Sequence, residues 1–126
     1  MLVGSRAPIL IVDDVEETRY LLRRVLQMKG YATAEAGTGA EALRYLRDGG
    51  PACLIILDMN LPDTTGRAVH AALKGDPSLA AIPVVIFSGM NPDGPMPDIV
   101  AYVRKGVEVD RLLSVVEAAC ASAGMG

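Results

Sequence analysis

The sequence is poor in the residues that cross-link small folds or bind metals through sulfur and nitrogen. It contains two cysteines and one histidine in 126 residues. A disulfide framework needs several closely spaced cysteines, and a structural zinc site needs about four ligands in close spacing. We therefore expect Cys53 and Cys120 to be reduced and to pack as small hydrophobic residues.

The chain also lacks an excess of positive charge and a long apolar run. Its net charge is −3 and its pI is about 5.0, whereas proteins that bind the phosphate backbone of nucleic acids present strongly basic surfaces. No apolar segment approaches the roughly 20 residues of a membrane helix, and residues 1–7 lack the apolar core of a secretory signal. These absences predict a cytoplasmic protein with no membrane contact and no direct nucleic-acid partner.

The composition that remains is that of one folded domain. Hydrophobic residues make up 51% of the chain and charged residues 21%, and single domains commonly contain about 100 to 150 residues. No linker, repeat or low-complexity tract divides the sequence. We expect residues 1–126 to form a single domain with flexible ends at 1–7 and 123–126.

Short branched apolar runs alternate with amphipathic helical stretches. Strands are expected at Ile9–Val12, Tyr31–Ala36, Cys53–Leu57, Val84–Phe87 and Val100–Val103. Helices are expected at Val15–Met28, after the capping box of Thr38 and Glu41, near Arg67–Lys74, and at Val109–Ala121, the last one ending before Gly124. This alternation predicts an α/β fold with a doubly wound parallel sheet of five strands.

Two stretches carry more specific expectations. The first helix should bury one apolar side, made of Leu21, Leu22, Val25, Leu26 and Met28. This arrangement leaves Arg19, Arg23 and Arg24 as candidates for the solvated side. The segment "MNPDGPMPD", residues 90–98, stands where a further helix would be, but it contains three prolines. Because proline removes a backbone donor and clashes with the preceding turn, this segment should be a loop or at most one short turn.

Polar residues follow four of the expected strands. Asp13 and Asp14 follow the first, Asp58 the third, Ser88 the fourth and Lys105 the fifth. In open α/β sheets, sites form at this edge, so we expect the groups to converge there. Crowded carboxylates take up protons unless a cation lies among them, and oxygen ligands suit Mg²⁺. Ser88 and Lys105 could bind an anion such as a phosphoryl group beside it.

Each of these residues also has an ordinary structural explanation. Asp13 and Asp14 could cap a helix, Asp58 and Ser88 could start turns, and Lys105 could be solvated. Their joint placement after four different strands favours a functional site over four coincidences.

Four motifs give the sequence a family resemblance. "ILIVDD" (9–14), "LIILDMNLPDTTG" (54–66), "PVVIFSG" (83–89) and "AYVRK" (101–105) resemble, in this order, the motifs of the receiver domain of two-component response regulators. The resemblance covers essentially the whole chain and implies a flavodoxin-like sheet with strand order 2-1-3-4-5. It also implies that Asp58 accepts a phosphoryl group from phosphohistidine of a sensor histidine kinase or a histidine phosphotransfer protein.

The same resemblance implies roles for the neighbouring residues. Asp14 and Asp58 would bind Mg²⁺ directly, Asp13 would bind it through water, and the backbone carbonyl of Asn60 would complete the protein ligands; Mn²⁺ could substitute. The anion-binding and switching residues would be Ser88, Lys105 and Tyr102, with Ser88 following the phosphoryl oxygen, Lys105 neutralising it and Tyr102 turning inward. These roles describe a phosphorelay switch with self-phosphorylation and autodephosphorylation, rather than an enzyme that turns over a substrate.

The sequence departs from the family pattern in two places. Gly106 stands where the family usually has a proline in a cis bond, which leaves Lys105 less fixed. The interval between Ser88 and Tyr102 is shorter than usual, so the fourth helix of the family should be shortened or missing. We expect residues 89–99 to form a loop whose rearrangement reports phosphorylation.

Other functions fit the residues less well. A haloacid-dehalogenase-type phosphatase needs a second aspartate two residues after the first, where this chain has Asn60. A flavodoxin-like cofactor site should not place Asp13 and Asp14 against a phosphate. His70 resembles a phosphotransfer histidine only faintly, and we expect it to be solvated. A pseudo-receiver scaffold that is not phosphorylated stays open as the alternative.

The sequence leaves the biological setting open. We expect no output domain after residue 126, which suits a stand-alone regulator or a phosphorelay shuttle, and a receiver taken from a longer protein is equally compatible. A homodimer is compatible with the sequence, and the cognate kinase and the downstream target are not identified by it.

Overall fold

A computed structural model describes residues 7–106 and 109–125, with side chains as far as Cys120. The elements are β1 (Ile9–Val12), α1 (Glu16–Met28), β2 (Thr33–Ala36), α2 (Gly39–Arg47), β3 (Leu54–Leu57), α3 (Gly66–Lys74), β4 (Val84–Ser88), β5 (Ala101–Arg104) and α4 (Val109–Met125). The strands form one parallel sheet in the order β2-β1-β3-β4-β5. This architecture confirms the expected flavodoxin-like fold.

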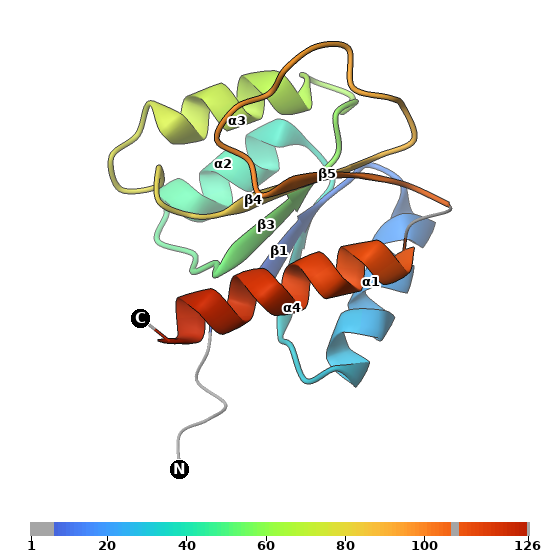
Figure 1. The fold of residues 1–126 in the computed structure, drawn as a ribbon. Helices are drawn as coiled ribbons and strands as arrows, with labels where there is room; N and C mark the ends of the chain where they lie inside the picture. Colours follow the sequence, from blue (N-terminus) through green and yellow to red (C-terminus); the bar gives the residue numbers. More distant parts are fainter. Residues whose placement is uncertain (1–6, 107–108, 126) are drawn as a thin grey trace.

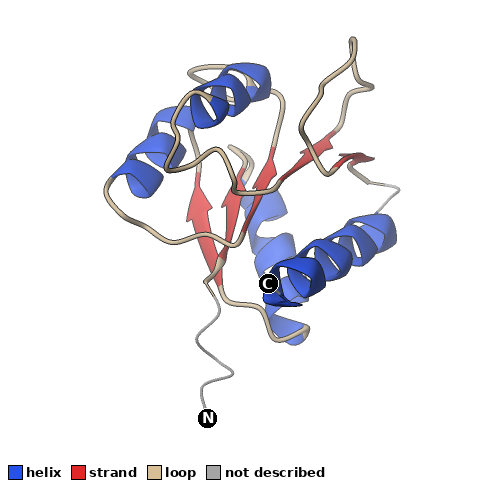
Figure 2. Cartoon of the chain, turned by 60° about the vertical axis from the view of Figure 1, so that its left-hand side comes forward, coloured by secondary structure: helices blue, strands red, loops and turns tan. Residues whose placement is uncertain are grey.

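The sheet lies between two layers of helices. Helices α1 and α4 cover one face and α2 and α3 cover the other (Figures 1 and 2). Successive strand residues point to opposite faces, so Leu10 and Val12 belong to the core beneath α2 and α3, while Ile9 and Ile11 belong to the core beneath α1 and α4. Strands that are covered on both faces explain the apolar runs without polar alternation.

The strand register brings the ends of the central strands to one level. Val12 pairs with Leu57, and Leu57 pairs with Ile86. The residues directly after β1 and β3 are Asp13 and Asp58, which therefore leave the sheet side by side at its carboxyl edge. Strand β4 continues to Ser88, one residue beyond the expected end of this strand.

Helix α1 buries a narrower apolar stripe than the sequence pattern suggests. Leu22 and Leu26 are buried, but Leu21 is 49% exposed and Met28 is 79% exposed. Residues 21 and 28 lie one above the other along the helix, about 100° around from Leu22, because each residue advances the helix by about 100°. The prediction that Leu21 and Met28 face the core is wrong.

The chain ends in a helix that is longer than expected. Helix α4 continues through Gly124 to Met125, because a glycine weakens a helix by about 1 kcal/mol without forcing it to end. Residues 123–125, expected to be flexible, belong to this helix, while residues 1–6 and 126 lie outside the described residues. Among the described residues, no helix is both long and apolar enough to cross a membrane.

Residues 89–100 connect β4 to β5 without a helix. The prolines of this segment exclude regular helical hydrogen bonding, so the expectation that the family's fourth helix is missing is confirmed. The loop rises from the carboxyl end of β4 and passes over α3 before it returns to β5 (Figure 1, orange). It is the longest stretch without regular structure among the described residues.

Candidate functional site

Three carboxylates meet at the carboxyl edge of the sheet. Asp13 and Asp58 are buried, with exposed fractions of 2% and 6%, while Asp14 is exposed. One carboxylate oxygen from each residue can be chosen so that all of them lie within 4.8 Å of one another. Oxygen donors at this spacing fit a hard divalent ion such as Mg²⁺, which takes a few carboxylates and keeps several waters.

Lys105 places its ammonium group among these carboxylates. Its Nζ lies 2.7 Å from Asp13 Oδ2 and 3.4 Å from Asp58 Oδ2. The backbone fixes its position, because the N–H of Lys105 donates to the carbonyl of Ser88 at 2.9 Å. The other oxygen of Asp13, Oδ1, accepts from the N–H of Val15 at 2.8 Å. The predicted carboxylates and amine therefore do converge.

The pKa values of the site reflect burial and opposing charge. Burial raises the pKa of Asp58, and the negative charge of Asp13 raises it further, while Lys105 acts in the opposite direction. For Lys105, burial lowers the pKa, but the hydrogen bond and charge of Asp13 and the charge of Asp58 outweigh burial and raise it. The lysine is therefore held as a cation beside the acidic residues.

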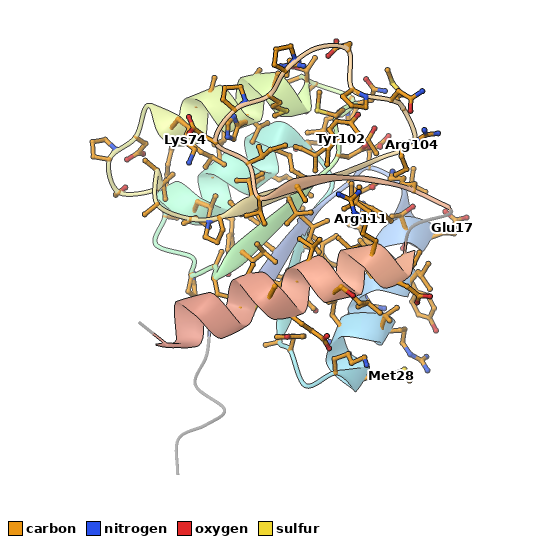
Figure 3. All side chains as sticks on the ribbon, viewed as in Figure 1. Glu17, Met28, Lys74, Tyr102, Arg104 and Arg111 are labelled. Atoms are coloured by element: carbon orange, nitrogen blue, oxygen red, sulfur yellow. The ribbon has the colours of Figure 1, made fainter. Side chains whose placement is uncertain are left out.

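Ser88, Asn60 and Tyr102 all contact one residue, Met90. Ser88 is buried, and its Oγ accepts from the N–H of Met90 at 3.2 Å. The hydroxyl of Tyr102 donates to the carbonyl of Met90 at 2.8 Å, and Asn60 Nδ2 lies 2.7 Å from Met90 Sδ. Tyr102 lies on β5 below the loop (Figure 3). Nothing in the sequence singles out Met90, because its contacts depend on the path of a loop.

Arg19 supports the acidic edge from α1. Its Nη1 donates to the carbonyl of Asp13 at 2.5 Å, and its Nε lies 3.2 Å from Glu35 on β2. Its side chain is only 19% exposed, so the prediction that Arg19 lies on the solvated side of the helix is wrong. The arginine is drawn inward because two acceptors hold its guanidinium group, the carbonyl of Asp13 just after β1 and the carboxylate of Glu35 on β2.

The loop after β3 is fixed by Asp63 and Gly66. Both carboxylate oxygens of Asp63 accept from the first turn of α2, at 2.9 Å from the N–H of Gly39 and 2.9 Å from that of Ala40, and these bonds lower the pKa of Asp63. A Cβ on Gly66 would lie 2.6 Å from the carbonyl oxygen of Asp58. A larger residue at 66 would therefore displace the backbone of the central carboxylate.

Gly106 has a backbone conformation that suits glycine. Its φ is +86°, in the left-handed region, although a Cβ there would meet nothing within 4 Å. The turn after Lys105 therefore favours a residue that adopts a positive φ at no steric cost, as glycine does. The reason is the backbone conformation and not a lack of space for a Cβ.

His70 is not solvated, contrary to expectation. It is 8% exposed, and its Nε2 lies 3.2 Å from the carbonyl oxygen of Asp98. Its helical face looked exposed in the sequence because Arg67 and Lys74 share it. The loop of residues 89–100 covers this part of α3, and a sequence pattern within one helix cannot show a covering loop.

Comparison with known protein families gives a match over most of the chain. The model of the response regulator receiver domain matches residues 9–117. The polar-differentiation response regulator DivK of Brucella ovis is 32% identical over 114 residues, which cover 86% of this chain and 92% of DivK. DivK of Brucella anthropi matches with the same identity and coverage.

Solved structures share the fold. The response regulator protein TrrA of Thermotoga maritima, solved in complex with Mg²⁺-BeF, superposes with a TM-score of 0.80 at 27% identity, covering 90% of this chain and 99% of TrrA. The signal receiver domain of a signal transduction histidine kinase from Syntrophus aciditrophicus gives a TM-score of 0.81 at 28% identity, with coverage of 93% and 92%.

Proposed function

Because the chain belongs to the family of response regulator receiver domains, we propose that it accepts a phosphoryl group on Asp58 from phosphohistidine of a sensor histidine kinase or a histidine phosphotransfer protein. The family is a signalling module of two-component systems rather than an enzyme with substrate turnover. The observation that carries the proposal is the convergence of Asp13, Asp14, Asp58 and Lys105 at one sheet edge.

The proposed transfer is a displacement at phosphorus. An oxygen of Asp58 forms the new O–P bond, the P–N bond of phosphohistidine breaks, and the histidine nitrogen keeps the electron pair. A bound Mg²⁺, or Mn²⁺ in its place, would supply positive charge against the phosphoryl oxygens. The groups that would hold it are Asp13, Asp14, Asp58 and the backbone carbonyl of Asn60. The Mg²⁺-BeF complex of TrrA supports this assignment by similarity.

Lys105 and Ser88 would bind the phosphoryl group, and Tyr102 would change the surface in response. Lys105 Nζ, 3.4 Å from Asp58 Oδ2, pairs with a phosphoryl oxygen as a point charge. The Ser88 hydroxyl donates to a second oxygen, and Tyr102 responds through Met90, which both residues contact. We place this single-domain switch in the cytoplasm, together with its histidine-bearing partner.

The test uses a small phosphodonor, so that no partner has to be known. Wild-type protein incubated with acetyl phosphate and Mg²⁺ should gain the mass of one phosphoryl group in an intact-mass spectrum. Asp58→Asn, and wild type with excess EDTA, should gain none. A wild type that gains no phosphoryl group and shows no Mg²⁺ binding in a titration would be a pseudo-receiver scaffold instead.

A further inference from the structure

We infer that Arg67 and His70 of α3 act as a clamp on the loop of residues 89–100, and that this clamp restrains phosphoryl transfer at Asp58. The inference rests on the proposed function and assigns two positioning residues to it. The clamp is defined by the contacts of Arg67 with residues 93–95 and of His70 with Asp98.

Arg67 engages the loop with every nitrogen of its guanidinium group. Nε and Nη2 lie 3.2 and 2.7 Å from Asp93 Oδ1, while Nη2 and Nη1 donate to the carbonyls of Gly94 and Pro95 at 3.1 and 3.0 Å. A planar fork of donors can satisfy several acceptors at once, which a lysine ammonium cannot do in the same geometry. Arg67 therefore fixes the position of three consecutive loop residues relative to α3.

His70 holds the returning half of the loop. The ring is buried, and Nε2 lies 3.2 Å from the carbonyl oxygen of Asp98. Asp98 has a φ of +65°, a conformation that few residues other than glycine adopt. On either side of it, Met96 and Ile99 pack against the core beneath α2 and α3. The loop is thus attached to α3 at two points and to the core between and beyond them.

The first residues of the loop are tied to the phosphoacceptor site instead. Met90 contacts Ser88 Oγ, the Tyr102 hydroxyl and Asn60 Nδ2. Only Asn91 and Pro92 separate Met90 from Asp93. The short segment of residues 90–92 therefore joins the groups expected to move on phosphorylation to the first point of the clamp.

A small cavity gives this segment room to move. It has a volume of about 100 Å³ and is lined by Met59, Thr65, Arg67, Met90, Asp93 and Tyr102, among others. Residues that border a void can shift without compressing a close-packed neighbour. Its lining includes the switch residue Tyr102 and Arg67 of the clamp, so it borders both ends of this segment.

These contacts predict the direction of the coupling. When the Ser88 hydroxyl turns toward a phosphoryl oxygen on Asp58, its oxygen moves away from the Met90 N–H, which now donates to it. Met90 and the start of the loop then shift to follow the hydroxyl. The clamp resists this displacement. Because coupling between two sites is reciprocal, weakening the clamp should favour phosphorylation, and a phosphoryl mimic should weaken the clamp.

The test compares Arg67→Gln with Arg44→Gln. Arg44→Gln is a matched control, because it also removes one cation from a helix, but the Arg44 side chain is 85% exposed and its Nε lies 3.8 Å from Asp48 Oδ2. We expect Arg67→Gln to raise amide exchange across residues 89–100 and to raise the affinity for beryllium fluoride with Mg²⁺, each by about two- to fivefold, the range that a surface ion pair can supply. Arg44→Gln should change neither.

Further variants separate the guanidinium fork from its charge. Arg67→Lys keeps the charge and should resemble Arg67→Gln, and beryllium fluoride with Mg²⁺ should raise loop exchange in wild type more than in Arg67→Gln. Faster exchange in Arg67→Gln at an unchanged affinity for beryllium fluoride would overturn the inference and leave the proposed function standing. Unchanged exchange would overturn it as well. A wild type that gains no phosphoryl group would overturn both.

Discussion

At the scale of single residues, Lys105 balances two buried carboxylates. Replacing it by methionine removes the ammonium 2.7 Å from Asp13 and 3.4 Å from Asp58. We expect Lys105→Met to lower the free energy of unfolding by about 1–3 kcal/mol in EDTA, because buried acceptors lose a charged partner. Added Mg²⁺ should recover part of this loss, since it replaces the missing positive charge.

Thermal unfolding with and without Mg²⁺ measures this effect. The increase in melting temperature caused by Mg²⁺ should be larger for Lys105→Met than for wild type. Lys74→Met is the control, because the Lys74 side chain is exposed at the last residue of α3 and its Nζ donates to the carbonyl of Ala80 rather than to a carboxylate of the acidic edge. An equal increase in all three proteins would show that Lys105 does not balance the site.

Gly106 offers a second prediction, since a proline there would restore the usual family residue. Proline requires a φ near −65°, whereas Gly106 has +86°. We expect Gly106→Ala to destabilise the protein by about 1 kcal/mol, because only the positive φ opposes alanine. Gly106→Pro should destabilise it more, because the proline ring cannot adopt this φ. Urea unfolding gives the ranking, and a Gly106→Pro variant as stable as wild type would contradict it.

The residues that follow strands could be predicted from the sequence, and those that meet through a loop could not. Asp13, Asp14, Asp58 and Lys105 converge as expected because parallel strands end at one edge whatever their loops do. The role of Met90 could not be predicted, because a methionine in a proline-rich loop belongs to no recognisable pattern. Its contacts arise only from the path that the loop takes.

At the scale of elements, Asp63 links the loop after β3 to the first turn of α2. Its bonds from Gly39 and Ala40 lower its pKa below the ordinary value of 3.8. A carboxyl group whose pKa is lower in the folded than in the unfolded chain stabilises the fold fully at a pH above its unfolded-state pKa. This stabilisation is lost as the pH falls through its folded-state pKa. Asp63 should therefore stabilise the protein at neutral pH and not in strong acid.

Asp63→Asn tests this link. The amide has one acceptor oxygen for two N–H groups and no charge for the helix N-terminus. We expect the variant to be less stable than wild type at neutral pH, with the difference shrinking as the pH falls below 3.8. Urea unfolding over that pH range is the measurement. A difference that does not depend on pH would show that the charge of Asp63 contributes nothing.

At this scale the sequence pattern predicts some features of the elements and not others. The prolines of residues 90–98 correctly excluded a helix, because they remove the necessary donors. The same pattern could not show that the loop lies on α3, so the prediction that His70 is solvated is wrong. On α1, the apolar pattern predicts that Met28 faces the core, but Met28 projects from the end of the helix (Figure 3). An apolar residue beside an apolar stripe does not have to belong to it.

At the scale of the whole molecule, a rigid sheet carries its site at one edge and a single long loop beside it. Two helix layers bury the strands from both faces, so a charge change at Asp58 can move the sheet only slightly. The loop of residues 89–100 has no regular structure, and it packs against the core through Met96 and Ile99. The strand order and layers could be predicted from the sequence because alternation of strands and helices leaves few topologies.

The central claim is that the buried carboxylate of Asp58, rather than its acidic neighbours, takes the phosphoryl group. Wild type treated with acetyl phosphate and Mg²⁺ should be trapped with borohydride, which reduces an acyl phosphate, then digested and mapped by mass spectrometry. We predict that the modified residue is Asp58 and that Asp58→Asn carries no modification. Modification at Asp13 or Asp14, or of Asp58→Asn to the same extent as wild type, would contradict the account.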